Sequence, residues 1–590
     1  MPPDLSELSR IAAALLPAQQ LDGLLAAPDS EALPDTLHRL IAAAEQQVWH
    51  SGPAAAGADA LQGLYREVER LLGGAGLPRH HIHVVMPVAD RPMHLRACLQ
   101  SLRSCVEAFG YGGPISVVIA DDSAAEDSLA AQQAIAEEFA AGAIETLYFG
   151  PQQQWELLSK LDDAQRRQLR NLIGDVAPGR MGHKGASVMR NISKLMLARL
   201  AAARERALFF FVDSDQEFHA DTRDGEPVYA LNYFYHLDRL FREHDIEVLT
   251  GKVVGDPPVS PAVMAGTLLQ DVLAFVDEAS RLAPDAACPF HSEQALGQSA
   301  AYHDMSALFG FDRPAQACRY ICRRADAHAV AESVLDFTDG LQRFFDGEHP
   351  TRSTAFSADD VEASLTTART VYTGNYVLRS SALRFFIPFA SQRLRMAGPT
   401  LGRLMQAQIG ERFVSANLPM LHKRTHRETG RAELRTGVDR QGDSVDLSGE
   451  YERQFLGDLV LFSVAQLVAE GYPDRVDQAQ LAAQLSATSE KLHAQYAQVR
   501  QELMQRVGQL EARLAGLETW LDSDPRLAAA AAELRAFLRI LDRNYSEQAV
   551  VVQRLADADY LAQRRQELLQ ALCELPADRQ AWHAILGQKQ

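Results

Sequence analysis

The sequence predicts an α/β protein with an open sheet, flanked by helical regions at both ends. Three short apolar runs are typical of buried strands, namely HIHVVMPV (81–88), ISVVIADDS (115–123) and LFFFVDSD (208–215). A helical pattern from Leu95 to Phe109 separates the first two. Open sheets of this kind bind ligands beyond the carboxyl ends of their strands. The acidic residues that end the second and third runs are therefore placed where function is expected.

Composition supports a globular protein and disfavours some partners. The chain has 590 residues, of which 47% are hydrophobic and 23% are charged. A formal net charge of −19 argues against nucleic acid or anionic lipid as a partner. The first residues, MPPDLSELSR, lack a secretory signal pattern, and no apolar run reaches the length of a transmembrane segment. A cytoplasmic protein is expected.

The cysteines and one polar stretch are interpreted as ordinary side chains. Six cysteines are scattered along the chain, and the pair Cys318 and Cys322 has no second pair nearby. Reduced thiols are therefore favoured over a zinc site. His291, His303 and Asp304 could form an acceptor loop, but surface polar residues are the favoured interpretation.

Three regions are expected along the chain: a helical N-terminal extension (1–78), an α/β domain (79–450) and a helical, coiled-coil-like C-terminal region (451–590). Prolines divide the first region into short helices. An apolar stripe in the third favours packing within the chain, with a homodimer through these helices left open. The stripe consists of Leu492, Tyr496, Val499, Leu503, Val507, Leu510, Leu514 and Leu517.

The segment FFFVDSDQEF places Asp213 and Asp215 on either side of Ser214, directly after an apolar strand. Two carboxylates at a strand end can share a divalent cation, and Mn²⁺ and Mg²⁺ prefer oxygen ligands. Such a cation neutralises charge on a leaving diphosphate, which is the difficult part of transferring a sugar from a nucleotide donor. An acidic turn without a metal is the alternative.

A second group of residues is basic. Arg180, His183, Lys184 and Arg190 lie around the glycine-containing start of a helix, at GHKGASVMRN. Backbone N–H groups and cationic side chains at a helix start suit a phosphate group. A solvated basic helix start is the alternative interpretation.

Residues 82–450 resemble the GT-A fold of nucleotide-diphospho-sugar transferases, in particular the large family 2-like group. IHVVMPVADRPMHLRACLQSL, VVIADDSAAEDS and GHKGASVMRNISKLMLA are similar to that family's nucleotide-binding segments, although Asp90 stands where asparagine is commoner. The resemblance implies an Asp213/Asp215 metal site. It also implies nucleotide-sugar contacts from Pro87, Asp90, Arg91, Asp121, Asp122, Ser123, Gly182, Lys184, Arg190 and Ser214.

Two later segments extend the resemblance. TGNYVLRSSALRFFIPF is similar to the segment that lines the acceptor side, which implies acceptor contacts from Thr373, Gly374 and Asn375. LPMLHKRTH is similar to the family's closing strand, where a histidine completes the metal shell in some members. His422 is the matching residue, and an imidazole nitrogen is tolerated as a third ligand of Mn²⁺ or Mg²⁺.

One departure concerns the catalytic base. Inverting members carry a Glu-Asp pair where this chain has Gly398 and Pro399. A hydroxyl acceptor must lose its proton as it attacks. Either Asp256, which follows another apolar strand, acts as the base, or the enzyme is retaining and the leaving phosphate takes the proton. The segment His422-Lys423-Arg424 resembles some retaining enzymes, so retention is favoured over inversion.

The expected function is a metal-dependent glycosyltransferase that uses a UDP- or GDP-sugar and a hydroxyl acceptor. A catalytically degenerate scaffold protein of the same fold is the alternative, supported by the missing Glu-Asp pair. A sugar nucleotidyltransferase is disfavoured, because MPVADRPMH lacks the glycine-rich loop expected of that class.

Overall fold

The computed structural model describes residues 5–25, 32–51, 55–202, 206–220, 228–291, 317–322, 324, 326–354, 356, 359–423, 436–442 and 444–587. Its centre is a nine-stranded sheet with the order β3-β2-β1-β4-β8-β6-β9-β5, in which β7 also pairs with β9. The strands are β1 (His81–Val88), β2 (Ile115–Asp121), β3 (Glu145–Phe149), β4 (Ala207–Val212), β5 (Gln216–Glu217), β6 (Val248–Gly255), β7 (Thr366–Thr367), β8 (Asn375–Arg379) and β9 (Phe413–His422). A separate hairpin pairs β10 (Asp439–Gln441) with β11 (Ser444–Asp446).

Strand direction brings the predicted site residues to one edge of the sheet. β1 is parallel to β2 and β4, and β6 is parallel to β9. β8 runs antiparallel to both β4 and β6, so β4 and β6 point the same way. The strand ends at Val88, Asp121, Val212, Gly255 and His422 therefore share one edge, which we call the carboxyl edge.

Alternating side chains divide the core into two layers. Leu208, Phe210 and Val212 of β4 pack with the N-terminal helices and with α5 (Pro92–Phe109), α6 (Glu126–Ala140) and α11 (Tyr233–Glu243). Phe209 and Phe211 pack on the opposite face. This period of two follows from strand geometry. The predicted class, an α/β open sheet with helical regions at both ends, is confirmed.

The remaining elements between the sheet strands are mostly helices. The α-helices are α5 (Pro92–Phe109), α6 (Glu126–Ala140), α7 (Pro151–Leu158), α8 (Asp163–Gln168), α9 (Arg170–Ile173), α10 (Ala186–Ala202), α11 (Tyr233–Glu243), α12 (Pro261–Ala279), α13 (Val330–Phe344) and α14 (Ala397–Ile409). The described residues of this part also include the 3₁₀ turns η3 (Ser380–Arg384), η4 (Ala390–Gln392) and η5 (Gly410–Arg412).

The N-terminal helices are α1 (Ser6–Ala12), α2 (Ala18–Leu24), α3 (Leu33–His50) and α4 (Ala55–Gly74). The expectation of short helices holds for the first two and is wrong for α3 and α4, which have 18 and 20 residues. Pro34 does not divide α3, because it lies in the first turn, where a proline removes no helical hydrogen bond.

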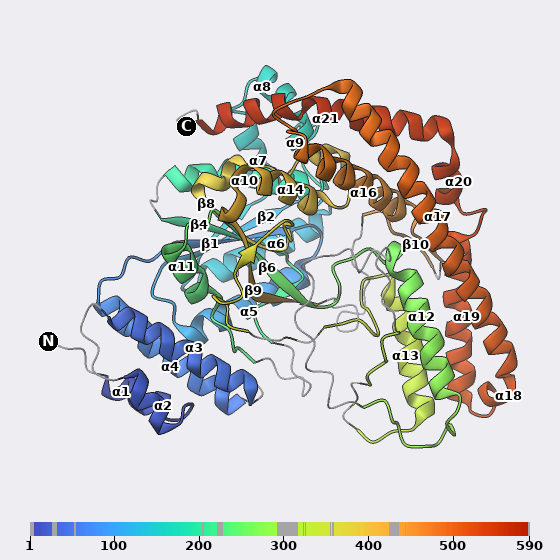
Figure 1. Cartoon of the computed structure of the whole chain (residues 1–590), viewed down its shortest axis with the longest axis horizontal. Helices are drawn as coiled ribbons and strands as arrows, with labels where there is room; N and C mark the ends of the chain where they lie inside the picture. Colours follow the sequence, from blue (N-terminus) through green and yellow to red (C-terminus); the bar gives the residue numbers. More distant parts are fainter. Residues whose placement is uncertain are drawn as a thin grey trace.

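The C-terminal helices are α16 (Ser448–Ala469), α17 (Gln478–Gly516), α18 (Glu518–Leu521), α19 (Pro525–Tyr545), α20 (Val550–Ala556) and α21 (Ala558–Gly587). In Figure 1 the orange α17 and red α19 lie beside α12 and α13. Leu492, Leu503 and Leu510 of the predicted stripe are buried in this packing, so the intramolecular interpretation is confirmed. The predicted boundary at residue 450 falls within α16. None of the described helices is long and apolar enough to cross a bilayer.

Candidate active site at the carboxyl edge

The turn after β4 is shaped by Gln216, which the sequence analysis did not single out. The backbone N–H of Asp213 donates to the Gln216 side-chain oxygen at 3.1 Å, and the Asp213 carbonyl accepts from the Gln216 backbone at 3.1 Å. Gln216 then pairs with His422 across the antiparallel β5 and β9. Because of this pairing, Asp215 follows β4 in sequence but lies beside the end of β9, although β4 and β9 are not neighbours in the sheet.

His422 and Asp215 are buried side chains that face each other, and each offers an atom suited to bind a metal. The Nδ1 atom of His422 lies 2.6 Å from the backbone oxygen of Asp256. Because a carbonyl only accepts, Nδ1 carries the hydrogen, and a neutral ring keeps its lone pair on Nε2. That Nε2 lies 3.6 Å from Oδ2 of Asp215, too far for a hydrogen bond. The arrangement suits a metal cation between the two atoms.

Arginines neutralise both aspartates. Arg190, buried on α10, forms an ion pair with Asp213. The Nη1 atom of Arg91 lies 3.2 Å from Oδ2 of Asp215. The two positive charges stabilise the acidic turn, and they also place two guanidinium groups where an anionic phosphate could be bound.

Gly374 allows close contact with Asp213. A Cβ atom at Gly374 would lie 2.8 Å from Oδ2 of Asp213, closer than side chains normally approach. The adjacent Asn375 is buried, and its amide donates to the backbone oxygens of Lys252 and Leu418 at 2.8 and 2.7 Å. The structure thus places Thr373 and Gly374 at the carboxyl edge, while the Asn375 amide links β8 to β6 and β9.

Asp122 holds the loop that precedes α10. Its carboxylate accepts from the Lys184 side chain at 2.6 Å and from the backbone N–H groups of Lys184 and Gly185 at 3.0 and 2.9 Å. Burial lowers the pKa of Lys184, although the Asp122 charge opposes this shift. A Cβ at Gly182 would lie 2.6 Å from the Ser123 carbonyl, so the loop and the end of β2 require a glycine there.

Asp90 joins the loops after β1 and β2. Its backbone N–H donates to the Ser123 hydroxyl at 2.7 Å, and its carboxylate pairs with His183. Asp90 and His183 both adopt positive φ, at 51° and 50°, a strained conformation that often marks functional loops. Burial raises the pKa of Asp90, but the His183 hydrogen bond and two backbone N–H groups outweigh it and lower the pKa overall.

Three other predicted contacts differ in exposure. Asp121 is fully buried, and its carboxylate accepts from the Ser123 backbone and the Tyr148 hydroxyl, both at 2.8 Å. Burial raises the pKa of Asp121. Ser214 is also buried, whereas Pro87 is half-buried near the end of β1. The Asp121 side chain therefore organises the end of β2 from inside.

Asp256 stands at the end of β6, beside His422. Its Oδ1 accepts from the His349 backbone N–H at 3.1 Å, and its own backbone N–H donates to the His422 carbonyl at 2.9 Å. The side chain is half-buried. Asp256 thus belongs to the same edge as the acidic turn, as the sequence predicted. Arg424, the third residue of the His-Lys-Arg segment, lies outside the described residues.

The loop before α14 is a feature that sequence patterns did not reveal. Phe389, Arg393 and Met396 all have positive φ, between 52° and 62°. A Cβ at Gly185 would lie 3.6 Å from the Arg393 side chain, so this loop approaches the Asp122-bound loop. Left-handed non-glycine residues cost free energy and cluster at binding sites. Gly398 and Pro399, which stand where the Glu-Asp pair is expected, lie in the first turn of α14, directly after this strained loop.

A buried lysine lies beneath the edge. Lys194, one turn along α10 from Arg190, is fully buried, and its ammonium group donates to the Phe385 carbonyl at 2.8 Å. Burial, with a contribution from the Arg190 charge, lowers its pKa to about 7.

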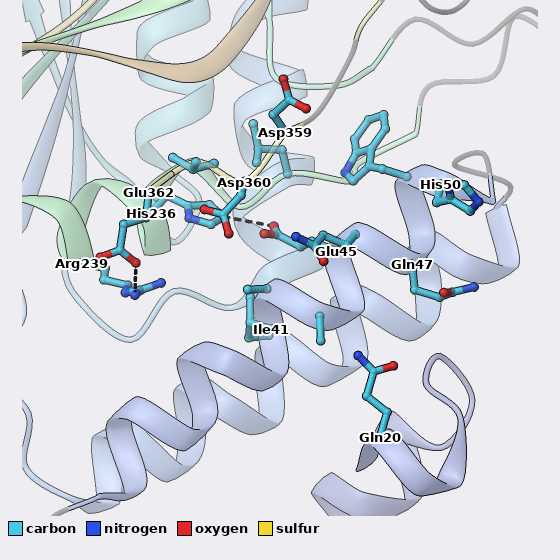
Figure 2. A pocket seen from close by; sticks show the side chains of 16 residues that line it. Gln20, Ile41, Glu45, Gln47, His50, His236, Arg239, Asp359, Asp360 and Glu362 are labelled. Carbon is cyan, nitrogen blue, oxygen red and sulfur yellow. Dashed lines mark hydrogen bonds and ion pairs between the residues drawn. The ribbon is translucent and has the colours of Figure 1, made fainter. Parts of the chain in front are cut away.

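A different part of the molecule contains a large cavity. Figure 2 shows it between α3 and residues 359–362. Its volume is about 530 Å³. Glu45, Asp359, Asp360 and Glu362 give it an acidic wall, and none of the predicted site residues lines it.

Comparisons with known proteins give only distant similarity. No family model and no curated protein matches the chain. Among solved structures, mannosyl-3-phosphoglycerate synthase from Rubrobacter xylanophilus is similar at 12% identity, over 35% of this chain and 50% of that chain, with a TM-score of 0.20. Core-mannan synthase A from Aspergillus fumigatus, in an Mn/GDP form, is similar at 10% identity, over 56% of this chain and 65% of that chain, with a TM-score of 0.20. The chain spans half of the first protein and less than two thirds of the second, and similarity this weak carries no argument about activity.

Proposed function

We propose that the chain is a metal-dependent glycosyltransferase that moves a sugar from a nucleotide-diphosphate donor to a hydroxyl acceptor. One observation carries the proposal: His422 and Asp215, brought together by the short β5–β9 pairing, face each other at 3.6 Å with Nδ1 of His422 fixed by the Asp256 carbonyl. The GT-A resemblance of residues 82–450 supports it.

The donor set fits a hard divalent cation. Asp213, Asp215 and His422 offer carboxylate oxygens and one imidazole nitrogen, which suit Mn²⁺ or Mg²⁺. Bound there, the cation would offset the charge that develops on a leaving diphosphate. Asp213 is paired with Arg190 in this structure, so its role as a ligand requires that Arg190 shift towards another anion.

The chain's own residues would bind and orient the donor. Arg91 and Arg190 can exchange their carboxylate partners for phosphate oxygens, because guanidinium groups bind both through paired hydrogen bonds. Asp90, Asp122 and Ser123 hold the loops after β1 and β2, which would receive the nucleoside. The positive-φ loop at 389–396 would lie on the sugar or acceptor side.

The stereochemical outcome follows from where the acceptor proton goes. Because Gly398 and Pro399 stand where inverting members of the resembling family carry a Glu-Asp pair, we favour retention, in which the leaving phosphate accepts the proton. Asp256 as a general base would give inversion instead. NMR of the anomeric configuration of the product distinguishes the two. Inversion, together with loss of turnover in Asp256→Asn, would overturn the retaining mechanism.

A donor-hydrolysis panel tests the function itself. Purified protein is incubated with UDP- and GDP-sugars, with and without Mn²⁺, and released nucleotide is measured. We expect metal-dependent release from one donor class and loss of release in Asp215→Asn. The exposed Asp175→Asn is the matched control and should retain activity. Nucleotide release that is absent with every donor would favour the scaffold alternative.

A further inference from the structure

A cluster of soft metal ligands lies outside the candidate active site. Cys288, His291, Cys322 and His328 each present one ligand atom, and the four atoms lie within 4.8 Å of one another. The first two follow α12 and the last two precede α13, on either side of residues 292–316. Cys322 is buried, Cys288 is half-buried and His291 is exposed.

The ring of His328 is oriented as a metal ligand. Its Nδ1 atom lies 2.7 Å from the backbone oxygen of Asp326, so Nδ1 carries the hydrogen and Nε2 keeps its lone pair. Nε2 lies 3.2 Å from the sulfur of Cys322. At zinc sites, a histidine usually donates the N–H of one ring nitrogen to a carbonyl or carboxylate and binds the metal through the other nitrogen.

The cysteines are also held in place by neighbouring groups. The buried Ser333 hydroxyl lies 2.9 Å from the Cys288 sulfur and 3.0 Å from Nε2 of His328, so it contacts both ligand-bearing segments. The Cys288 backbone N–H donates to the His328 carbonyl, and the Cys322 backbone N–H donates to the Phe290 carbonyl, both at 3.0 Å. These bonds join the two ligand-bearing segments directly, before any ion is considered.

Aromatic packing anchors each segment to the helices. Phe290 lies between the ligands Cys288 and His291, and its ring centroid is 5.0 Å from that of Phe275 on α12. Tyr320, two residues before Cys322, stacks its edge on the same Phe275 at 5.1 Å. The ligands are thus attached to rigid elements, as a preformed metal site requires.

We infer that Cys288, His291, Cys322 and His328 form a structural zinc site. Two sulfur and two imidazole donors select Zn²⁺ over Mg²⁺ or Mn²⁺. Tetrahedral zinc, with bonds of about 2.3 Å to sulfur and about 2.0–2.1 Å to nitrogen, separates its ligand atoms by roughly 3.4–3.8 Å, which the cluster can adopt. Four protein ligands leave no open position, so the site stabilises the fold and does not activate water.

The site would tie the segment after α12 to the segment before α13. Cys318, close to the second ligand pair, donates its backbone N–H to Asp271 at 2.8 Å, and Asp271 also pairs with Arg352. Thr354, shortly after Arg352, bridges to Gly255 at the end of β6. Zinc would therefore stabilise segments that are connected to the carboxyl edge through Asp271, Arg352 and Thr354.

The first test is metal content and coordination in the full-length protein. Protein purified without chelator should contain about one zinc per chain, measured by mass spectrometry of the metal. Co²⁺ substitution should give intense visible bands of tetrahedral cobalt and ultraviolet thiolate-to-cobalt bands. Absence of zinc, octahedral cobalt spectra, or a Cys288–Cys322 disulfide found by peptide mapping would each overturn the inference.

Variants test the assignment of ligands. Cys322→Ser and the exposed His291→Ala should lose zinc, whereas Cys318→Ser, in the same segment but outside the cluster, should keep it. His291→Ala keeps the test valid if Cys322→Ser fails to fold. Zinc retained in His291→Ala with unchanged cobalt bands would remove His291 from the site and contradict the four-ligand assignment. The inference does not depend on the proposed transferase activity.

Discussion

The carboxyl edge and the Cys₂His₂ cluster are two candidate metal sites with opposite designs. At the cluster, four soft donors already converge within 4.8 Å, and they are the one such group of three or more among the described residues. At the carboxyl edge, only Asp215 and His422 face each other, and Asp213 is held by Arg190. The first site presents four ligands for one ion, whereas the second presents two facing ligands beside a carboxylate that is paired with an arginine.

The two sets of ligands suit different roles, one in folding and one in catalysis. A closed site with sulfur ligands contributes to folding, because binding occurs only in the folded chain. A site with oxygen ligands and paired arginines exchanges partners readily, as a catalytic centre must when phosphate enters and leaves. The predictions below separate the two sites, from the largest expected effect to the smallest.

Chelators should act on the two sites in different ways. Brief EDTA treatment should abolish donor turnover, which Mn²⁺ restores, and should lower the unfolding temperature far less than removal of zinc does. Prolonged chelation that removes zinc should lower the unfolding temperature by several degrees. Activity and unfolding temperature measured on the same samples check this, and a simultaneous loss of both under brief EDTA would contradict the separation.

Substitutions should show the same division. Asp215→Asn should reduce donor turnover roughly 100-fold or more and leave the zinc content unchanged. Cys322→Ser should remove zinc and lower thermal stability. It should affect donor affinity only indirectly, through the Thr354–Gly255 contact at the end of β6. Zinc analysis and kinetics of both variants, with Asp175→Asn and Cys318→Ser as controls, provide the check. Zinc loss in Asp215→Asn would show that the sites are coupled.

Gly374→Ala should weaken metal binding at the carboxyl edge alone. The added methyl group would lie 2.8 Å from Oδ2 of Asp213 and displace that carboxylate. We expect about 10-fold weaker Mn²⁺ binding, typical of a disturbed supporting residue. Electron paramagnetic resonance titration of Mn²⁺ measures it. Gly73→Ala, where no atom lies within 4 Å of the new carbon, is the control, and equal affinities in both variants would refute the contact.

Lys194 should make stability depend on pH. Its folded pKa of about 7 lies below the unfolded value of about 10.4, so between these values the unfolded chain binds more protons. Stability of the wild type relative to Lys194→Met should therefore rise between pH 7 and 10, by at most about 1.4 kcal/mol per pH unit. Urea unfolding at several pH values tests this, and a flat difference would contradict the lowered pKa.

Sequence patterns predicted the carboxyl edge well because its residues follow strand ends. The apolar runs that became β1, β2 and β4 and the acids after them are local signals, so Asp122 and Asp213 could be located without a structure. The β5–β9 pairing has no such signal, since β5 contains only two residues. The left-handed loop at 389–396 was equally hidden, because none of its three strained residues is a glycine.

The Cys₂His₂ cluster could not be predicted from the spacing of cysteines and histidines along the sequence. Cys318 and Cys322 are close in sequence, yet Cys322 meets Cys288 and two histidines instead. His291, interpreted from sequence as a surface residue, is exposed but belongs to this cluster. Asp121 and Asn375 are the converse case. Their motif positions predicted contacts with the nucleotide sugar and the acceptor, but in the structure both residues are buried and their side chains hydrogen-bond within the protein.

The central claim is that the carboxyl edge binds a nucleoside diphosphate through a divalent cation. Thermal unfolding in the presence of UDP or GDP, with and without Mn²⁺, tests it most directly. At about 100 times the dissociation constant, a bound ligand adds about 2.7 kcal/mol of stability. We predict a shift with one nucleotide that requires Mn²⁺ and disappears in Asp215→Asn but not in Asp175→Asn. No shift with either nucleotide, or a shift that persists in Asp215→Asn, would contradict the account.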